Sequence, residues 1–197
     1  MSGHNKWSQI KNQKGITDKK RAILFSKILK AISVAAKNEP NPDFNPRLRS
    51  AIEIAKQLSV PKENIDRAIS KASETKNLEE LIIEGYGPEK VAIIVEVITD
   101  NRNRSTNEIR NIFNTTEGKM GEIGSAKWAF EAHQPGTNWT AKFTQNISTD
   151  GHIKLQTLIE ALENHDDVQK VITNQSTPPI PDIGWPLGHL MSKYWVL

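Results

Sequence analysis

The nine residues from Val91 to Thr99 constrain the fold most, because they are apolar and largely β-branched, with Glu96 as the only charged residue among them. A run of this length and composition is typical of a β-strand inside a sheet. Turn-forming residues flank it, with Gly85-Tyr86-Gly87-Pro88 before it and Asp100-Asn101-Arg102-Asn103-Arg104-Ser105 after it. The second part of the chain is therefore predicted to contain a sheet built around this strand.

Two helices are predicted to pack with this sheet. Ser105 or Thr106 can cap a helix that runs to Thr115, and Glu108 is available as the capping-box partner of Ser105. A second helix is predicted over residues 153–164, where apolar residues recur at helical spacing.

The remaining strands follow from alternating patterns. Within 126–131 the alternation is expected to place Trp128 and Phe130 on one face of a strand. Further strands are predicted at 81–86, 139–144 and 168–173. From Val91 onward the order is strand, helix, strand, strand, helix, strand, which predicts a ferredoxin-like split βαβ domain and therefore the α+β class.

The first 76 residues are predicted to form a helical domain of three helices preceded by a basic arm. Asn45-Pro46 forms an N-cap with proline at the first helical position, which opens a second helix to about Leu58. A third helix is expected from Pro61 to about Ser73. The first helix is expected from Asp18 to Asn38, where one face is apolar: Phe25, Ile28, Leu29, Ile32, Ala35 and Ala36.

The segment 54–69 imitates a helix-turn-helix, a motif that reads DNA bases with its second helix. That helix would carry Glu63 and Asp66 in its opening turns, where phosphates and base edges would lie. A plain helical hairpin is therefore favoured over a groove-reading motif.

The charge of the chain is concentrated at its N-terminus. Up to Lys37 the sequence has nine Lys and Arg residues against the single acid Asp18. Residues 1–76 carry 16 basic and 7 acidic side chains, a net charge of +9, whereas 77–197 carry 10 and 16, a net charge of −6. A basic arm of this kind suits a polyanion, because lysines neutralise phosphates and release counterions. A solvated lysine-rich helix is the alternative interpretation.

Several side chains of the first domain are candidate contacts with nucleic acid. Trp7 could stack on an unpaired base or pack in the core. Arg47 and Arg49 lie in the first turn of a helix, where cations oppose its dipole, so they could contact phosphate or form salt bridges. The arm and first helix supply the other candidates, which are Lys6, Lys11, Lys14, Lys19, Lys20, Arg21 and Lys27.

The sequence disfavours catalysis, metal binding and cofactors. It has no cysteine, and its five histidines show no metal-ligand spacing. His165-Asp166-Asp167 could suggest a metal site, but a cation near a helix C-terminus explains His165 more simply. The turn at Gly85 lacks the lysine of a phosphate-binding loop. We expect no enzyme, no small-molecule substrate and no cofactor; a protein-interaction module with an acidic docking surface is the remaining alternative.

The expected compartment is the cytoplasm. No secretory signal or transit peptide is visible, and no apolar run approaches the roughly 18–20 residues that span a bilayer.

The sequence resembles the YebC/PmpR family, whose members include the mitochondrial translational activator of cytochrome c oxidase. The resemblance is carried by ordered blocks between residues 3 and 174: Gly3-His4-Asn5-Lys6-Trp7, Ile10-Lys11, Asp18-Lys19-Lys20-Arg21, Phe25-Ser26-Lys27, Asn45-Pro46-Arg47-Leu48-Arg49, Pro61-Lys62-Glu63-Asn64-Ile65, Glu84-Gly85-Tyr86-Gly87-Pro88, Asp100-Asn101-Arg102-Asn103-Arg104, Gly118, Gly121, Gly124-Ser125, Phe130-Glu131 and Asp166-Asp167-Val168-Gln169.

The resemblance implies non-enzymatic control of gene expression by a protein that binds nucleic acid. Family members are described as DNA-binding transcriptional regulators and as translation factors that associate with the ribosome and its RNA. The positions carried over as nucleic-acid contacts are the lysines of the arm together with Arg102 and Arg104.

The resemblance also implies three domains, and here the sequence departs from the family. Only Ala132–Asn138 joins two predicted strands where the family inserts its third domain. We therefore predict a basic arm and helical domain (1–76), an α+β domain without the inserted domain (77–174), and an atypical Pro-rich and apolar tail (175–197). A shortened variant with reduced activity is a further alternative.

Overall fold

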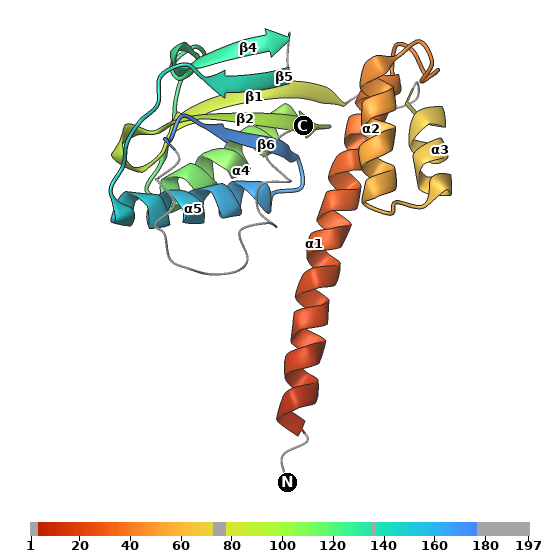
Figure 1. The fold of residues 1–197 in the computed structure, drawn as a ribbon, viewed down its shortest axis with the longest axis horizontal. Coiled ribbons are helices and arrows are strands. Elements are labelled where there is room, and N and C mark those ends of the chain that lie inside the picture. Colours follow the sequence, from red (N-terminus) through yellow and green to blue (C-terminus); the bar gives the residue numbers. More distant parts are fainter. Residues whose placement is uncertain (1–3, 73–77, 135–136, 177–197) are drawn as a thin grey trace, which may run out of the picture.

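The structure is a computed structural model that describes the backbone of residues 4–72, 78–134 and 137–176 and the side chains of residues 20–72, 78–132 and 139–176. Figure 1 shows a helical part beside a sheet that is covered by further helices. The predicted tail, 175–197, lies outside the described residues from 177 onward.

Helix α1 spans His4–Ala36 and is 33 residues long. The prediction that a helix starts near Asp18 was wrong, because the helix begins 14 residues earlier. No proline interrupts this stretch, and Gly15 costs only about 1 kcal/mol in a helix interior. At about 1.5 Å per residue α1 is about 50 Å long, and its N-terminal half projects beyond every other labelled element (Figure 1).

Helices α2 (Pro46–Gln57) and α3 (Lys62–Ser70) pack on the C-terminal half of α1. Asn45 caps α2 as predicted, because its side chain accepts a hydrogen bond from the backbone N–H of Leu48. The same side chain donates to the carbonyl of Ala35 and so also fixes the end of α1. The buried core between the three helices is apolar: Ile28, Ile32, Ala35, Ala36, Leu48, Ala51, Ala55, Val60, Ile65 and Ala72.

A four-stranded antiparallel sheet forms the centre of the second part, with strand order β3-β1-β2-β6. Its strands are β1 (Glu79–Tyr86), β2 (Ala92–Thr99), β3 (Lys119–Met120) and β6 (Val168–Thr173). β2 is the strand predicted from the apolar run. Helix α4 (Arg102–Thr115) connects β2 to β3 while β1 lies between these two strands, so the predicted split βαβ unit and the α+β class are confirmed.

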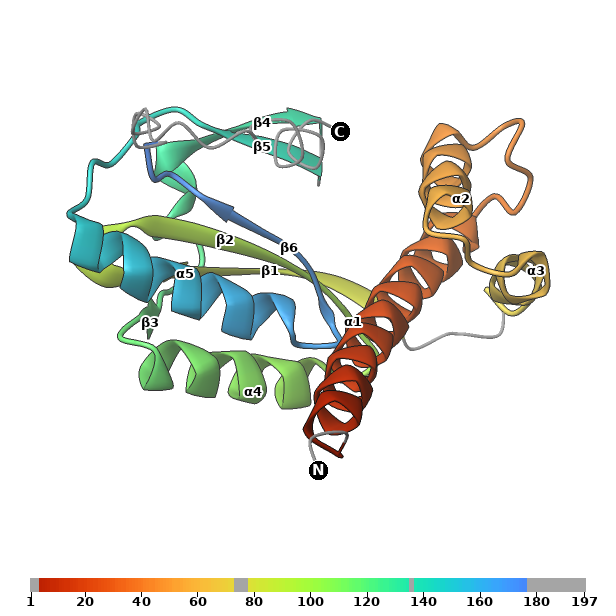
Figure 2. The ribbon, with the colours of Figure 1, turned by 60° about the horizontal axis from the view of Figure 1, so that its bottom comes forward.

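Helices α4 (Arg102–Thr115) and α5 (Thr149–Glu163) both cover one face of this sheet (Figure 2). Alternate residues of β2 point to that face, because successive side chains in a strand point to opposite sides. The core formed there includes Ile93, Val95 and Val97 from β2 with Ile109, Phe113, Leu155, Leu158 and Leu162 from the helices.

The opposite face is covered by a separate hairpin of β4 (Phe130–Gln134) and β5 (Thr137–Ala141), which pair only with each other (Figure 2). The predicted ferredoxin-like order would instead place both strands in the main sheet. Phe130 at the start of the hairpin, with Ala126 and Ala129 just before it, packs against Ala92, Ile94 and Ile172 of the sheet.

The prediction that Trp128 and Phe130 share a strand face was wrong. Residues Lys127–Ala129 form a short 3₁₀ helix, so Trp128 is 57% exposed and Phe130 is buried. The cause is Glu84, whose buried carboxylate accepts hydrogen bonds from several backbone N–H groups of the segment 124–127 and bends it away from a strand.

The predicted cap of α4 was also wrong. Asn101 caps the helix through the backbone N–H of Arg104, so α4 begins at Arg102 rather than after Ser105 or Thr106. Ser105 is fully buried and donates its hydroxyl to the carboxylate of Asp167 instead.

The α5 helix similarly begins four residues before the predicted start at Ile153, with Ser148 as its cap.

Across the described residues, no helix is long and apolar enough to cross a membrane.

Candidate nucleic-acid interface

The candidate cations of α1 fall into two groups, according to whether they lie beside the second part of the molecule. Lys27 lies beside it: its side chain is largely buried and its ammonium donates to the backbone carbonyl of Glu163 at the end of α5, 2.5 Å away. Burial lowers the pKa of Lys27, and the carboxylates of Glu163 and Asp166 offset part of this effect. Lys27 therefore holds α1 against α5.

Lys30, one turn further along α1, forms an ion pair with Asp167. Its ammonium lies 2.5 Å from Asp167 Oδ1 and also donates to the carbonyl of Asp166 at 3.2 Å. Asp167 precedes β6 and its side chain is only 4% exposed. The ion pair thus joins the helical part to the sheet through a buried carboxylate.

Arg104 binds the other oxygen of the same carboxylate. Its guanidinium donates to Asp167 Oδ2 at 2.8 Å, and the hydroxyl of Ser105 donates to that oxygen at 2.6 Å. Burial raises the pKa of Asp167, but the hydrogen bonds from Lys30, Ser105 and Arg104 outweigh burial and hold the pKa well below its ordinary value. We call this group, Lys30, Arg104, Ser105 and Asp167, the junction cluster.

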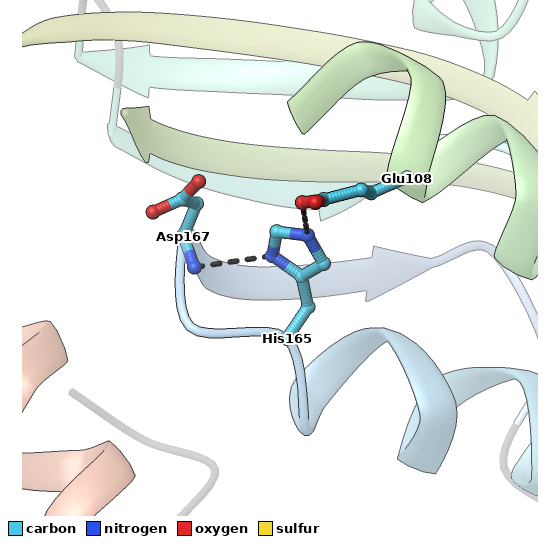
Figure 3. A group of neighbouring side chains, drawn as sticks. All are labelled: Glu108, His165 and Asp167. Carbon is cyan, nitrogen blue, oxygen red and sulfur yellow. Dashed lines mark hydrogen bonds and ion pairs between the residues drawn. The ribbon is translucent and has the colours of Figure 1, made fainter. Parts of the chain in front are cut away.

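His165 extends the junction cluster toward α4 (Figure 3). Its Nδ1 accepts from the backbone N–H of Asp167 at 3.1 Å, and its Nε2 lies 2.9 Å from the carboxylate of Glu108. Since Nδ1 accepts, Nε2 carries the proton that is donated to Glu108. His165 therefore bridges α5 and α4, a role that its place at a helix end did not indicate.

Glu108, His165 and Asp167 bring their ligand atoms within 4.8 Å of one another, so this is a geometry that could hold a metal ion. The donors already present argue against that use. Both ring nitrogens of His165 and both oxygens of Asp167 have hydrogen-bond partners in the protein, and a cation would also meet the charges of Lys30 and Arg104.

Two clefts flank α1 where it crosses the second part. One has a volume of about 790 Å³, and its lining includes Lys30, Asp100, Arg104, Glu108, Asp166 and Asp167. The other has a volume of about 520 Å³ and includes Lys20, Lys27, Glu160 and Glu163. Acidic side chains line both clefts, so neither offers a uniformly positive surface to a phosphate.

Other candidate cations lie at the surface. Lys20 is 3.6 Å from Glu160 in an exposed pair, and the guanidinium of Arg21 lies 5.2 Å from the centre of the Phe25 ring. Exposed pairs of this kind contribute little stability, so both cations remain accessible to a partner.

The predicted arginines have different surroundings. Arg47 is paired with Glu80 of β1, and the hydrogen bonds that its guanidinium donates to this carboxylate raise the pKa of Arg47. Arg49 donates to the carbonyls of Pro42 and Asp43, which shows that both first-turn arginines have partners inside the protein. Arg102 is exposed on the first turn of α4.

The N-terminal candidates lie on the projecting half of α1, but their side chains are outside the described residues. The backbone of all five is helical, and their roles remain predictions. They are Lys6, Trp7, Lys11, Lys14 and Lys19.

The sequence reasoning missed an aromatic surface on the hairpin side of the sheet. Trp128 and Phe143 are 57% and 52% exposed, and their ring centres are 5.9 Å apart. Each follows a lysine directly in the sequence, Lys127 and Lys142. This repeated lysine-aromatic pair was the available signal.

Two family models match this chain. Residues 5–75 match the model described as "TACO1/YebC protein N-terminal domain", and residues 78–135 match "TACO1/YebC second and third domain". A "probable transcriptional regulatory protein" of Solibacter usitatus is 40% identical over 97% of this chain and 83% of its own length. The chain therefore belongs to the TACO1/YebC family.

A relative with the same description from Trichlorobacter lovleyi is 54% identical over 135 residues, which is 66% of this chain and 55% of that protein. The chain thus matches about half the length of several curated relatives. The crystal structure of a conserved hypothetical protein from Aquifex aeolicus superposes with a TM-score of 0.74 at 34% identity, covering 81% of this chain and 91% of that one. This likeness confirms the arrangement of helices followed by an α+β region.

Proposed function

We propose that this protein is a non-enzymatic regulator of gene expression that binds DNA through the projecting half of α1. The observation that carries the proposal is the combination of shape and charge. The four turns from His4 to Lys19 stand clear of the other labelled elements, and their sequence holds four lysines and one acid (Figure 1). A projecting basic helix can offer its lysines to the phosphate backbone of DNA.

The names of the relatives support the transcriptional reading, because those proteins are described as probable transcriptional regulators. A ribosome-associated translation factor that binds ribosomal RNA is the second candidate. The exposed face of α3 carries Glu63 and Asp66, and these acidic side chains make α3 unsuited to reading base edges in a groove of duplex DNA. This favours the second candidate. The proposed site comprises Arg102 and the α1 candidates other than Lys27, whose ammonium is bonded to the carbonyl of Glu163. For Arg47, Arg49 and Arg104, phosphate contact would require giving up the partners described above.

We also propose the domain division at about residue 76, with a shortened connection between β4 and β5 in place of an inserted third domain. The second family model stops matching at residue 135, within this connection, which supports the proposal. The shortened connection is also the basis for the alternative that this chain has reduced activity.

Salt dependence tests the proposed contact. A helix that makes about six to ten phosphate contacts loses about 10³–10⁵ in affinity between 50 and 200 mM salt. Replacing Lys6, Lys11 and Lys14 with Ala should reduce the slope of log K against log salt by about 3, since each contact contributes about one. The matched control replaces three exposed lysines of the same domain: Lys37, Lys56 and Lys62.

Equal effects of the two triple variants on binding would contradict the proposed helix contact. Crosslinking in cells, followed by sequencing of the bound nucleic acid, separates the two candidate functions. Promoter DNA supports the transcriptional regulator, and ribosomal RNA supports the translation factor.

A further inference from the structure

The surface around Trp128 is distant in sequence from the basic helix and has a different chemistry. Trp128 follows Lys127 in the 3₁₀ helix before β4, and Phe143 follows Lys142 just after β5. The two rings are tilted by 35° and are both more than half exposed. Large aromatic side chains are rarely left at a surface in a pair unless something covers them.

The indole of Trp128 is held in place. Its Nε1–H donates to the hydroxyl of Tyr86 at 3.2 Å, and that hydroxyl donates to the carbonyl of Ser125. The hydrogen-bonding need of the indole is thus met inside the protein, and its exposed face is apolar. A ring that is already fixed loses little conformational entropy when it binds a flat partner.

A cleft of about 440 Å³ lies beside this ring and is lined by Tyr86, Lys90, Trp128 and Gln145. Lys90 is exposed and adopts a left-handed backbone conformation, with φ of 65°, as does Glu89 before it, with φ of 52°. For residues other than glycine this conformation costs about 1–2 kcal/mol each. The carboxylate of Glu89 is turned to Ser148, where it accepts from both the backbone N–H and the hydroxyl, so it does not neutralise Lys90.

Two lysines lie near the aromatic pair, Lys142 beside Phe143 and Lys90 in the cleft beside Trp128. Lys142 Nζ lies 5.5 Å from the centre of the Phe143 ring, and Lys127 Nζ lies 5.9 Å from the centre of the Trp139 ring and 3.8 Å from Glu84. The described residues that line the cleft include a lysine and no carboxylate. Rings flanked by cations match a ligand with flat aromatic groups joined by phosphates.

We propose that the surface formed by Trp128, Phe143, Lys90 and Lys142 binds an unpaired base of single-stranded RNA, with the base stacked on Trp128 and the flanking phosphates near the lysines. Folded RNA contains unpaired bases in its loops and bulges, and proteins commonly bind these bases by stacking them on aromatic side chains. The site rests on the second candidate of the proposed function, RNA binding, and adds to it a contact that duplexes cannot make.

The test measures fluorescence anisotropy with the full chain and a labelled single-stranded RNA of about 12 nucleotides, a length within common site sizes. Trp128→Leu keeps apolar bulk but removes the aromatic face, and it should weaken binding about 5- to 150-fold, the range expected for one stacked base. Trp128→Phe should retain most of the affinity. The duplex of the same sequence should bind both variants as it binds the wild type.

The matched control is Phe44→Leu, because Phe44 is 77% exposed in the loop before α2 and lies outside the proposed surface. Equal binding by Trp128→Leu and Trp128→Phe would overturn the proposal, as would a loss that is the same for the duplex. A dimer in the absence of RNA that disappears in Trp128→Leu would assign the surface to a second copy of the chain. RNA that binds at least as tightly as DNA of the same sequence supports the assignment, and a preference for the DNA overturns it.

The same variants in the background that lacks Lys6, Lys11 and Lys14 separate this inference from the proposed function. Residual RNA binding that depends on Trp128 supports the stacking surface even if the helix contact fails. An unchanged affinity on replacing Trp128, with a strong loss on removing the lysines, supports the helix contact and overturns the stacking surface.

Discussion

Two buried carboxylates organise different regions of this protein, and they are satisfied in opposite ways. Asp167 in the junction cluster is bound by side chains, with Lys30 from α1 and both Arg104 and Ser105 from α4. Glu84 in β1 is bound mainly by the backbone, with N–H groups of Gly124, Ala126 and Lys127 at 2.7–2.9 Å. Each side chain is less than 5% exposed.

The difference determines which cations remain for a partner. Asp167 engages two cations that the sequence would otherwise offer to phosphate, and it can do so only when α1 is docked on the sheet. Glu84 takes its main donors from the backbone of a single loop, and the ammonium of Lys127 lies farther away, 3.8 Å from the carboxylate. Lys90 and Lys142 are exposed beside the aromatic surface. Counting basic residues along the sequence thus overstates how many cations are available to a partner where the two parts of the molecule meet.

Replacing Asp167 should have the largest effect on stability. Asp167→Asn leaves Lys30 and Arg104 without their shared anion, and removing one member of a buried ion pair costs several kcal/mol. We expect a loss of about 3 kcal/mol in the free energy of unfolding, at the low end because both cations still reach water. Urea unfolding measures it. The exposed neighbour Asp166→Asn is the control, and equal losses in the two variants would refute the role of the junction cluster.

Replacing Glu84 should have a smaller and more local effect. Glu84→Gln removes the charge that strengthens three backbone hydrogen bonds, and we expect a loss of about 2 kcal/mol. Amide hydrogen exchange should accelerate at Gly124, Ala126 and Lys127 more than elsewhere. Glu79→Gln, at the exposed start of the same strand, is the control. Unchanged exchange at these amides would show that Glu84 does not hold the loop.

Lowering the pH should remove part of the contribution that Asp167 makes to the free energy of unfolding. This is the smallest of the three effects. The pKa of Asp167 is lower in the folded protein than the value of about 3.9 in unfolded chains. Its stabilisation is therefore fully present above about pH 4 and is lost as the pH falls toward the folded pKa. The loss should reach about 1 kcal/mol at pH 3. The free-energy difference between wild type and Asp167→Asn should narrow by that amount between pH 7 and pH 3, and a constant difference would contradict this assignment.

Local patterns predicted most elements of the fold. The run at Val91–Thr99 became a central strand, and Asn45-Pro46 became a helix cap, because each signal lies within a few residues of the structure it specifies. The errors had distant causes. Ser105 looked like a cap, but Asp167, 62 residues later in the sequence, binds its hydroxyl. The strand expected at 126–131 is bent by Glu84, about 40 residues earlier.

The nucleic-acid contacts remain predictions, and here too distant partners matter. Residue types indicated which side chains could meet phosphate, but not which ones already have partners. Arg104 was expected to contact nucleic acid and is paired with Asp100 and Asp167. Trp128 was predicted to lie on a strand face. The lysine that precedes it in the sequence was the available sign of an exposed aromatic surface.

The very short β3 has a consequence for solubility. It pairs with Gly85 and Tyr86 only, so the outer edge of β1 from Glu79 to Ile83 has no strand partner among the described residues. An open edge can recruit a strand from another molecule and start aggregation. Two adjacent carboxylates mark the beginning of this edge, and Arg47 of α2 reaches one of them, Glu80. The ion pair between the two parts of the molecule thereby keeps charged groups at the place where copies of the sheet would otherwise join.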